Sequence, residues 1–160
     1  MNAPPETRLG LKLHPERCTG CLSCLLACTL HHEGSCSVRW ARLVVTDTWD
    51  GEAFEIDVCR HCEEAPCMAA CEYGALFERE GIVALDRGSC TSCGACADAC
   101  SYGAIFFDPE EEKALKCDLC GGVPRCVTYC ETVALEFDAP DARFNGGRTE
   151  EAPRRLGWPS

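Results

Sequence analysis

Short apolar segments bounded by Gly, Asp or Pro recur along the chain and predict strands rather than long helices. Residues 54–58 alternate apolar with acidic side chains, which is the pattern of a strand with one buried face. Five further segments share this strand character and form pairs that predict hairpins, at residues 75–77, 82–85, 104–107, 113–115 and 133–137. The chain is therefore expected to contain several short hairpins.

Between these strand segments lie four runs of four cysteines, which contain all but one of the 17 cysteines. The first and third runs have the spacing C-x2-C-x2-C-x3-C, and the other two lengthen only the middle gap. The last gap puts two cysteines four residues apart, on one face of a short helix. Each unit is predicted to be a strand, a cysteine loop, a short helix and a strand, and the unit occurs four times.

The spacing of the runs is that of bacterial ferredoxins, whose thiolates bind [4Fe–4S] clusters. Three cysteines of such a run bind one cluster, and the fourth binds the neighbouring cluster. Small residues between the ligands, such as Gly20, Ser92 and Gly94, suit a backbone that passes close to a cluster and points amides at its sulfurs. Four runs therefore predict four [4Fe–4S] clusters in two pairs.

Structural zinc and disulfide bonds are the alternative interpretations. Zinc modules usually set two C-x2-C pairs apart by a longer loop, whereas here a third and fourth cysteine follow at once. Disulfide frameworks are typical of secreted chains, and the N-terminal residues show neither an apolar signal core nor twin arginines. Neither alternative explains the fourfold recurrence. Iron–sulfur clusters and a cytoplasmic location are therefore expected.

Composition adds limits on fold and partners. The 160 residues suit one ordinary domain, and removing cysteine from the 46% of hydrophobic residues leaves roughly 36% of the chain, a thin aliphatic core. Metal binding should therefore supply much of the folding free energy. The net charge of -11 argues against nucleic acid, and no apolar run approaches the ~20 residues of a membrane span. Protein partners are expected.

No nucleophile–base set, phosphate loop or dinucleotide fingerprint occurs, so the chain is predicted not to be an enzyme itself. Cys36 lies outside every run and is interpreted as a free structural thiol. The histidines at positions 31, 32 and 61 lie beside predicted ligands, and we expect them next to the clusters or at the surface. The acidic stretch 108–112 is interpreted as a solvated turn.

Four blocks carry a resemblance to a known family: PERCTGCLSCLLAC, VCRHCEEAPCMAAC, GSCTSCGACADAC and LKCDLCGGVPRCVTYC, in this order. With the segment 38–42, they make residues 11–137 similar to the four-cluster ferredoxin-like subunits of molybdenum and tungsten oxidoreductases. This group includes the electron-transfer subunits of DMSO reductase and formate dehydrogenase.

The resemblance implies four ligand sets, in which each fourth cysteine is exchanged between paired runs. We call them set A (Cys18, Cys21, Cys24, Cys130), set B (Cys28, Cys117, Cys120, Cys126), set C (Cys59, Cys62, Cys67, Cys100) and set D (Cys71, Cys90, Cys93, Cys96). The implied fold is α+β, with two interleaved dicluster ferredoxin-like units of short hairpin strands, cysteine loops and short helices, joined by irregular loops. Residues 1–48 with 108–138 form the outer unit, residues 49–107 form the inner unit, and residues 139–160 are a C-terminal docking arm or tail. The four clusters are expected in a line with the inner pair central.

Two departures from the family pattern matter. Family members commonly carry Pro after the fourth cysteine of a run, and here those positions hold Thr29, Glu72, Ser101 and Glu131. Because Pro fixes the backbone and removes a donor, the family's cluster potentials do not transfer. The small size is most similar to the small subunit of bacterial tungsten aldehyde oxidoreductases, and related subunits serve class II benzoyl-CoA reductases.

The resemblance implies an electron-transfer subunit that joins a tungsten or molybdenum pterin catalytic subunit to a flavin or NAD-binding subunit or another acceptor. One alternative is a free polyferredoxin shuttle. Another is a subunit of a benzoyl-CoA reductase or of a formate dehydrogenase or hydrogenase-type complex. A zinc-bound scaffold is the alternative from a different class. Self-association of copies into a head-to-tail chain also stays open.

Overall fold

The structure, a computed structural model, describes residues 9–138, and the predicted docking arm at 139–160 lies outside them. The strands are β1 Gly10–Leu13, β2 Leu43–Asp47, β3 Phe54–Val58, β4 Leu76–Arg79, β5 Ile82–Leu85, β6 Ile105–Phe107, β7 Ala114–Lys116 and β8 Leu135–Asp138. The α-helices are α1 Ser23–Glu33, α2 Pro66–Ala69, α3 Ala95–Ala99 and α4 Arg125–Thr128. Three 3-10 turns complete the elements: η1 Pro15–Arg17, η2 Val38–Trp40 and η3 Leu119–Gly121.

The predicted unit of strand, cysteine loop, helix and strand occurs four times, which confirms the α+β fold. Strands β3 and β5 have the predicted bounds, and the other predicted strands are shifted by one or two residues. Each strand that leaves one run pairs antiparallel with the strand that leads into the next: β2 with β3, β4 with β5, and β6 with β7. The last strand, β8, pairs with β1 and closes this series. Between residues 9 and 138 no helix is long and apolar enough to cross a membrane.

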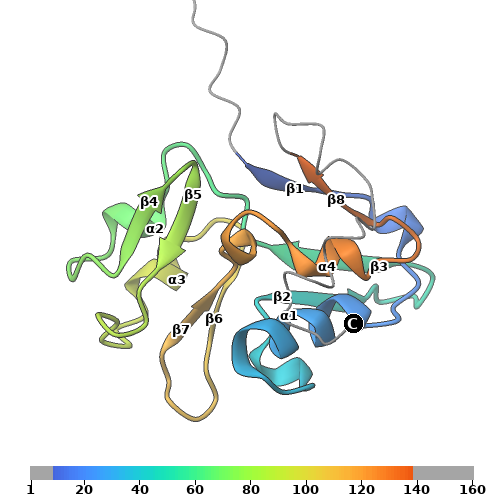
Figure 1. The fold of residues 1–160 in the computed structure, drawn as a ribbon, viewed down its shortest axis with the longest axis horizontal. Helices are drawn as coiled ribbons and strands as arrows, with labels where there is room; N and C mark the ends of the chain where they lie inside the picture. Colours follow the sequence, from blue (N-terminus) through green and yellow to red (C-terminus); the bar gives the residue numbers. More distant parts are fainter. Residues whose placement is uncertain (1–8, 139–160) are drawn as a thin grey trace, which may run out of the picture.

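Two halves of the molecule lie side by side in Figure 1. Strands β4 and β5 with helices α2 and α3 form one half, and β1, β2, β3, β8, α1 and α4 form the other. The β6–β7 hairpin lies between them. Helix α2 packs on α3, and α1 packs on α4. The second and third runs thus meet in one half, and the first and fourth meet in the other.

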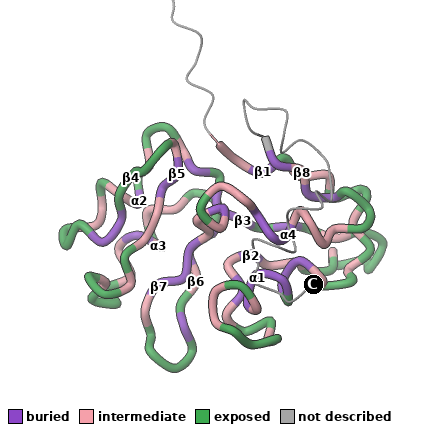
Figure 2. The backbone as a smooth tube through the Cα atoms, in the orientation of Figure 1, coloured by how far each residue is buried: buried purple, intermediate pink, exposed green. Residues whose placement is uncertain are grey.

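Each half has its own small apolar cluster (Figure 2). Ile56 and Val58 of β3 pack in the cluster of the first and fourth runs, although they precede the second run. Ala114 of β7 packs in the cluster of the second and third runs, although it precedes the fourth. Hairpins β2–β3 and β6–β7 therefore cross the predicted unit boundaries at 48/49 and 107/108. The division of the chain into an outer and an inner unit stays a prediction.

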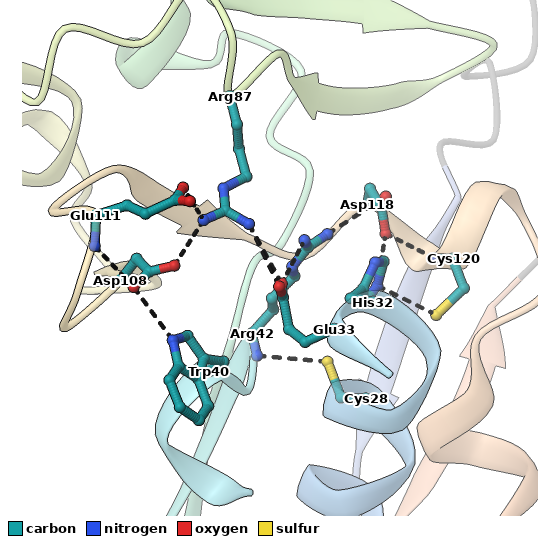
Figure 3. Close-up of polar contacts among 10 residues, drawn as sticks. All are labelled: Cys28, His32, Glu33, Trp40, Arg42, Arg87, Asp108, Glu111, Asp118 and Cys120. Carbon is teal, nitrogen blue, oxygen red and sulfur yellow. Dashed lines mark hydrogen bonds and ion pairs between the residues drawn. The ribbon is translucent and has the colours of Figure 1, made fainter. Parts of the chain in front are cut away.

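A polar network joins the two halves (Figure 3). The Arg87 guanidinium, from the segment after β5, donates to Asp108 Oδ2 at 2.6 Å and to Glu111 Oε2 at 3.0 Å. Its other terminal nitrogen lies 3.4 Å from Glu33 Oε1 at the end of α1. Arg42 also lies 3.4 Å from Glu33 Oε1, so one carboxylate bridges two guanidinium groups. The network fixes the end of α1 against the loop after β6.

Asp108 is the most buried carboxylate of this network, with 5% of its surface exposed. Its Oδ1 accepts from the Trp40 indole at 3.1 Å and from the Glu110 amide at 2.8 Å. Burial acts to raise the pKa of Asp108. Hydrogen bonds from the backbone amides of Glu110 and Glu111 and from the Trp40 and Arg87 side chains outweigh burial and lower this pKa. Residues 109–112 are exposed, as expected of a solvated turn. Asp108 itself departs from that expectation because it accepts the hydrogen bonds that fold the turn.

We expect Asp108→Ala to destabilise the protein, because it leaves the Trp40 indole and two backbone amides without their acceptor and removes one of the three carboxylates around Arg87. The loss should be about 2 kcal/mol, or roughly 4–8 °C in the melting temperature of the protein with its clusters bound. Glu111→Ala is the matched control, since this exposed carboxylate binds the same Arg87 nitrogen and should change stability by less than about 0.5 kcal/mol. Thermal scans at one heating rate, followed by visible absorbance, measure both variants. Equal losses would contradict the structural role of Asp108.

Candidate iron–sulfur centres

The four cysteines of set C converge on one cavity, and so do the four of set D. The set C cavity is lined by all four of its cysteines together with Val83 and Lys116, and has about 400 Å³ of space free of protein atoms. The set D cavity is lined by its four cysteines together with Tyr73 and Phe107, and has about 340 Å³. In each case three cysteines come from one run and the fourth from the paired run. These are the cysteines that the family resemblance assigns to sets C and D, and their crossed ligation of two clusters stays a prediction.

Sets A and B converge in the other half of the molecule. Burial, together with the neighbouring Cys130, Cys21 and Cys18, raises the pKa of Cys24 to about 12. These four cysteines are the members of set A. Burial likewise raises the pKa of Cys120 to about 12, and Cys28 on α1 adds to the shift. Cys28 acts in the same direction on Cys117 and Cys126, so the first run supplies the fourth member of set B.

The cysteine loops share one backbone conformation. The residue before the second cysteine has a positive φ in every run: Gly20 at 67°, His61 at 48°, Ser92 at 62° and Leu119 at 53°. The left-handed region disfavours side chains with a Cβ, so three of these residues are held in a strained conformation. Gly20 is the exception, and a Cβ there would clash with the Phe54 ring. The same turn thus recurs between the first and second cysteines of all four runs.

A second repeated turn follows the fourth cysteine of three runs. The third residue on has a positive φ, at Gly74, Gly103 and Val133, and is followed by a buried alanine, Ala75, Ala104 or Ala134. The Ala134 amide donates to Cys130 Sγ at 3.2 Å, and the Ala104 amide lies 3.5 Å from Cys100 Sγ. In the first run a longer segment intervenes, and the Arg42 amide donates to Cys28 Sγ at 3.4 Å. In the first, third and fourth runs, the sulfur of the fourth cysteine thus accepts a hydrogen bond from a backbone amide.

The donor sets fit a group that carries positive charge. Iron binds the thiolate form, and burial raises the pKa of Cys28, Cys67 and Cys96 as well as those of the cysteines above. Several buried thiolates facing one another are unfavourable without a cation between them. An iron–sulfur core supplies that cation, and amides such as those of His61 and Leu119 reach Cys59 and Cys117 at 3.4 Å. The residues present fit [4Fe–4S] clusters; that each set binds one stays a prediction.

Sets A and B lie in one half of the molecule, where α1 packs on α4, and sets C and D lie in the other, where α2 packs on α3. Lys116 Nζ donates to the carbonyl of Cys117 in set B, and the same side chain lines the set C cavity, so sets B and C adjoin. Helix α2 carries Cys67 of set C, helix α3 carries Cys96 of set D, and the two helices pack on each other. The expected line with the inner pair central therefore differs from the structure, because the two pairs lie end to end. Cys21 in set A and Cys93 in set D are the exposed predicted ligands.

The histidines that flank the runs have different surroundings. His61 is 1% exposed, and its Nδ1 accepts from the Val83 amide at 3.1 Å, so its role is structural. His32 Nε2 lies 3.7 Å from Cys120 Sγ and 3.3 Å from Asp118 Oδ1. The ligand atoms of His31, His32 and Cys120 lie within 4.8 Å of one another. Because Cys120 belongs to set B, we interpret the two histidines as neighbours of that set. Cys36 is exposed, as a free thiol outside the runs.

Two lysines that lie near the cysteine sets were not identified from the sequence as functional residues. Lys113 Nζ donates to the carbonyls of Arg87 and Cys90, both at 3.0 Å. Lys116 Nζ donates to the carbonyls of Val83 and Cys117, the latter at 3.0 Å. Each lysine thus binds the carbonyl of the first cysteine of a run. The one signal in the sequence is that Lys116 directly precedes Cys117.

The chain matches two related families of iron–sulfur proteins. Residues 52–139 match the 4Fe-4S dicluster domain, and residues 15–38 match a 4Fe-4S binding domain. Together these matches include every cysteine run. The 17 cysteines fit four [4Fe–4S] clusters.

The similarity to three described proteins extends over most of the chain. The polyferredoxin-like subunit of an aliphatic sulfonate oxidoreductase of Pyrococcus furiosus is 33% identical, over 81% of this chain and 76% of that protein. The thiosulfate reductase electron transfer subunit PhsB of Salmonella typhi is 35% identical, over 84% of this chain and 78% of that protein. A chain of the active site complex BamBC of benzoyl coenzyme A reductase shares the fold, with a TM-score of 0.50, 24% identity and coverage of 81% and 78%.

Crossed ligation predicts which cluster each fourth cysteine supports. Cys62 and Cys93 serve as references, because each lies in the middle of its own run. We expect Cys100→Ala to give the low-temperature electron paramagnetic resonance spectrum of Cys62→Ala, since both remove a set C ligand. Cys71→Ala should instead match Cys93→Ala, since both remove a set D ligand. If Cys100→Ala matched Cys93→Ala, the fourth cysteine would belong to its own run and the crossed pairing would be wrong.

Proposed function

The chain belongs to the family of 4Fe-4S dicluster ferredoxin-like proteins, and we propose that it is a non-catalytic electron-transfer subunit that carries four [4Fe–4S] clusters in sets A to D. Its curated relatives include an electron transfer subunit and a polyferredoxin-like subunit of oxidoreductases. The observation that carries the proposal is the gathering of the cysteines of sets C and D on two cavities, with set B adjoining set C at Lys116 and with the exposed Cys21 and Cys93 in sets A and D.

The residues of this chain are suited to holding a series of redox centres rather than to bond chemistry. Bound clusters supply one-electron acceptance and release. The protein surrounds each set with apolar side chains and backbone amides aimed at the sulfurs, as at Cys28, Cys117 and Cys130. Such amides favour the more negative, reduced state of a cluster and so raise its reduction potential. Sets B and C, in the middle of the series, hold buried or half-buried cysteines throughout.

Two different surfaces would exchange electrons with partners. At the set D end, exposed Tyr73 and Phe107 line the cavity beside Cys93. At the set A end, Leu22 and Leu26 are exposed beside Cys21. Exposed large apolar side chains next to a redox centre are suited to contact with a protein partner. Two such ends favour a subunit placed between two partners over a free shuttle, which needs only one transient contact face.

The partners are proposed by analogy with the relatives. One is the catalytic subunit of an oxidoreductase, for which we favour a tungsten or molybdenum pterin enzyme, of the aldehyde oxidoreductase type. The other is a flavin or NAD-binding subunit or another acceptor. The two curated relatives described above belong to oxidoreductases of sulfonate and thiosulfate. A cytoplasmic location and the docking of residues 139–160 on a partner belong to the same proposal.

The proposal predicts about sixteen iron and sixteen acid-labile sulfide per chain, four of each per cluster. The measurement is metal and sulfide analysis of the chain purified anaerobically from its own host through an affinity tag, with associated subunits identified in the same preparation. Zinc in place of iron, without labile sulfide, would refute the cluster assignment. Iron and sulfide in a chain that co-purifies with nothing would instead favour the free shuttle.

The two ends can be separated by substitution. Leu26→Glu at the set A end and Phe107→Glu at the set D end each place a charge on an apolar contact surface without touching a cysteine. We expect both variants to keep full iron and sulfide, and each to slow electron exchange with a different partner by at least about tenfold. Stopped-flow reduction and reoxidation within the purified complex measure the two exchanges. Loss of the same exchange in both variants would argue against a relay that runs from one end to the other.

A further inference from the structure

Lys116, at the end of β7, is a buried lysine at the junction of the two cluster pairs. It is 2% exposed and lines the set C cavity together with Cys59, Cys67 and Cys100. Its Nζ donates to the carbonyl of Val83 in β5 and to the carbonyl of Cys117 in set B. One ammonium group thus contacts the surroundings of both central sets.

The carbonyl of Val83 explains why a donor is needed here, but not why the donor is charged. Val83 is 1% exposed, and its amide donates to His61 Nδ1 while its carbonyl accepts from Lys116. Buried backbone groups need such partners, and a neutral amide side chain could serve the carbonyl equally well. An ammonium taken out of water requires compensating negative charge as well.

The compensating charge does not come from a carboxylate within residues 9–138, because none of the ion pairs recorded there includes Lys116. The groups that become anionic on cluster binding and share a cavity with Lys116 are the four thiols of set C. Burial raises the pKa of Cys67, and the charge of Lys116 acts in the opposite direction and lowers it. Four thiolates around an iron–sulfur core carry a net negative charge, which becomes more negative on reduction.

We propose that Lys116 sets the reduction potential of the set C cluster through a buried positive charge between sets B and C. This proposal rests on the proposed function, since it requires a cluster in set C. The charge stabilises the reduced cluster more than the oxidised one, because the reduced form is more negative. The low dielectric of the buried site strengthens this effect. Lys116 therefore raises the potential of set C most, and that of set B to a lesser extent.

The test is a redox titration of the full-length chain with its clusters bound, followed by electron paramagnetic resonance. The set C signal is identified as the one that Cys62→Ala removes. Lys116→Met and Lys116→Gln should lower the set C potential so that the ratio of reduced to oxidised cluster at a fixed potential falls about tenfold, or 59 mV for one electron. Lys116→Arg should keep a near-native potential. Lys113→Met is the matched control, because Lys113 also donates to two carbonyls but is only half-buried and does not line the set C cavity.

Each outcome decides the proposal. A lowered set C potential in Lys116→Gln, with iron and sulfide unchanged, supports it, because the glutamine keeps a donor and removes only the charge. An unchanged potential in that variant refutes it and leaves Lys116 as a donor to Val83. If neither neutral variant binds the set C cluster, binding by Lys116→Arg supports a requirement for charge, and failure of Lys116→Arg refutes it. Absence of iron from the native chain would refute the proposed function instead.

Discussion

The pairing of the cysteine runs in space is the constraint on which the rest of the structure depends. Cysteines of the second and third runs line two common cavities where helix α2 packs on α3, and helix α1 of the first run packs on α4 of the fourth. The apolar clusters are too small to impose this arrangement alone, since they consist largely of strand ends and the cysteines themselves. Strand pairing and the binding of metal by the cysteines are therefore expected to stabilise this fold to an extent that a larger apolar core provides in other proteins.

Strand pairing connects the runs into one series. Each hairpin joins the strand that leaves one run to the strand that enters the next, and β1–β8 closes the series over the longest sequence separation. Hairpin β2–β3 packs in the apolar cluster of the first and fourth runs, and hairpin β6–β7 packs in that of the second and third runs. The chain therefore passes from one half to the other directly after β3 and directly after β7. Arg87, Glu33 and Asp108 add a polar connection beside the β6–β7 hairpin (Figure 3). A relay benefits from this rigidity, because electron transfer between fixed centres depends on their separation.

A buried charged side chain lies where sets B and C adjoin. Lys116 there is one of few charged residues in the described chain with almost no exposure, together with Asp108 and Arg125. Asp108 has its guanidinium partner, whereas Lys116 faces thiolates and carbonyls. A buried cation with no carboxylate beside it is expensive unless a bound anionic group compensates it. The buried Lys116 is therefore consistent with the proposed cluster in set C, which would supply the compensating negative charge.

The cysteine spacing by itself determined the cluster type, the fourfold unit and the strand–loop–helix–strand order, because ligand spacing and short-range periodicity are local properties. Strands β3 and β5 were predicted to the residue, since alternating or continuous apolar segments with clear turn residues mark them. The left-handed conformation of His61 and Leu119 could not be predicted, because residues with a Cβ adopt it uncommonly. The end-to-end order of the sets, the buried position of Lys116 and the network around Arg87 were decided by the tertiary structure. Each of them brings together residues far apart in the chain, and local sequence carries no information about such contacts.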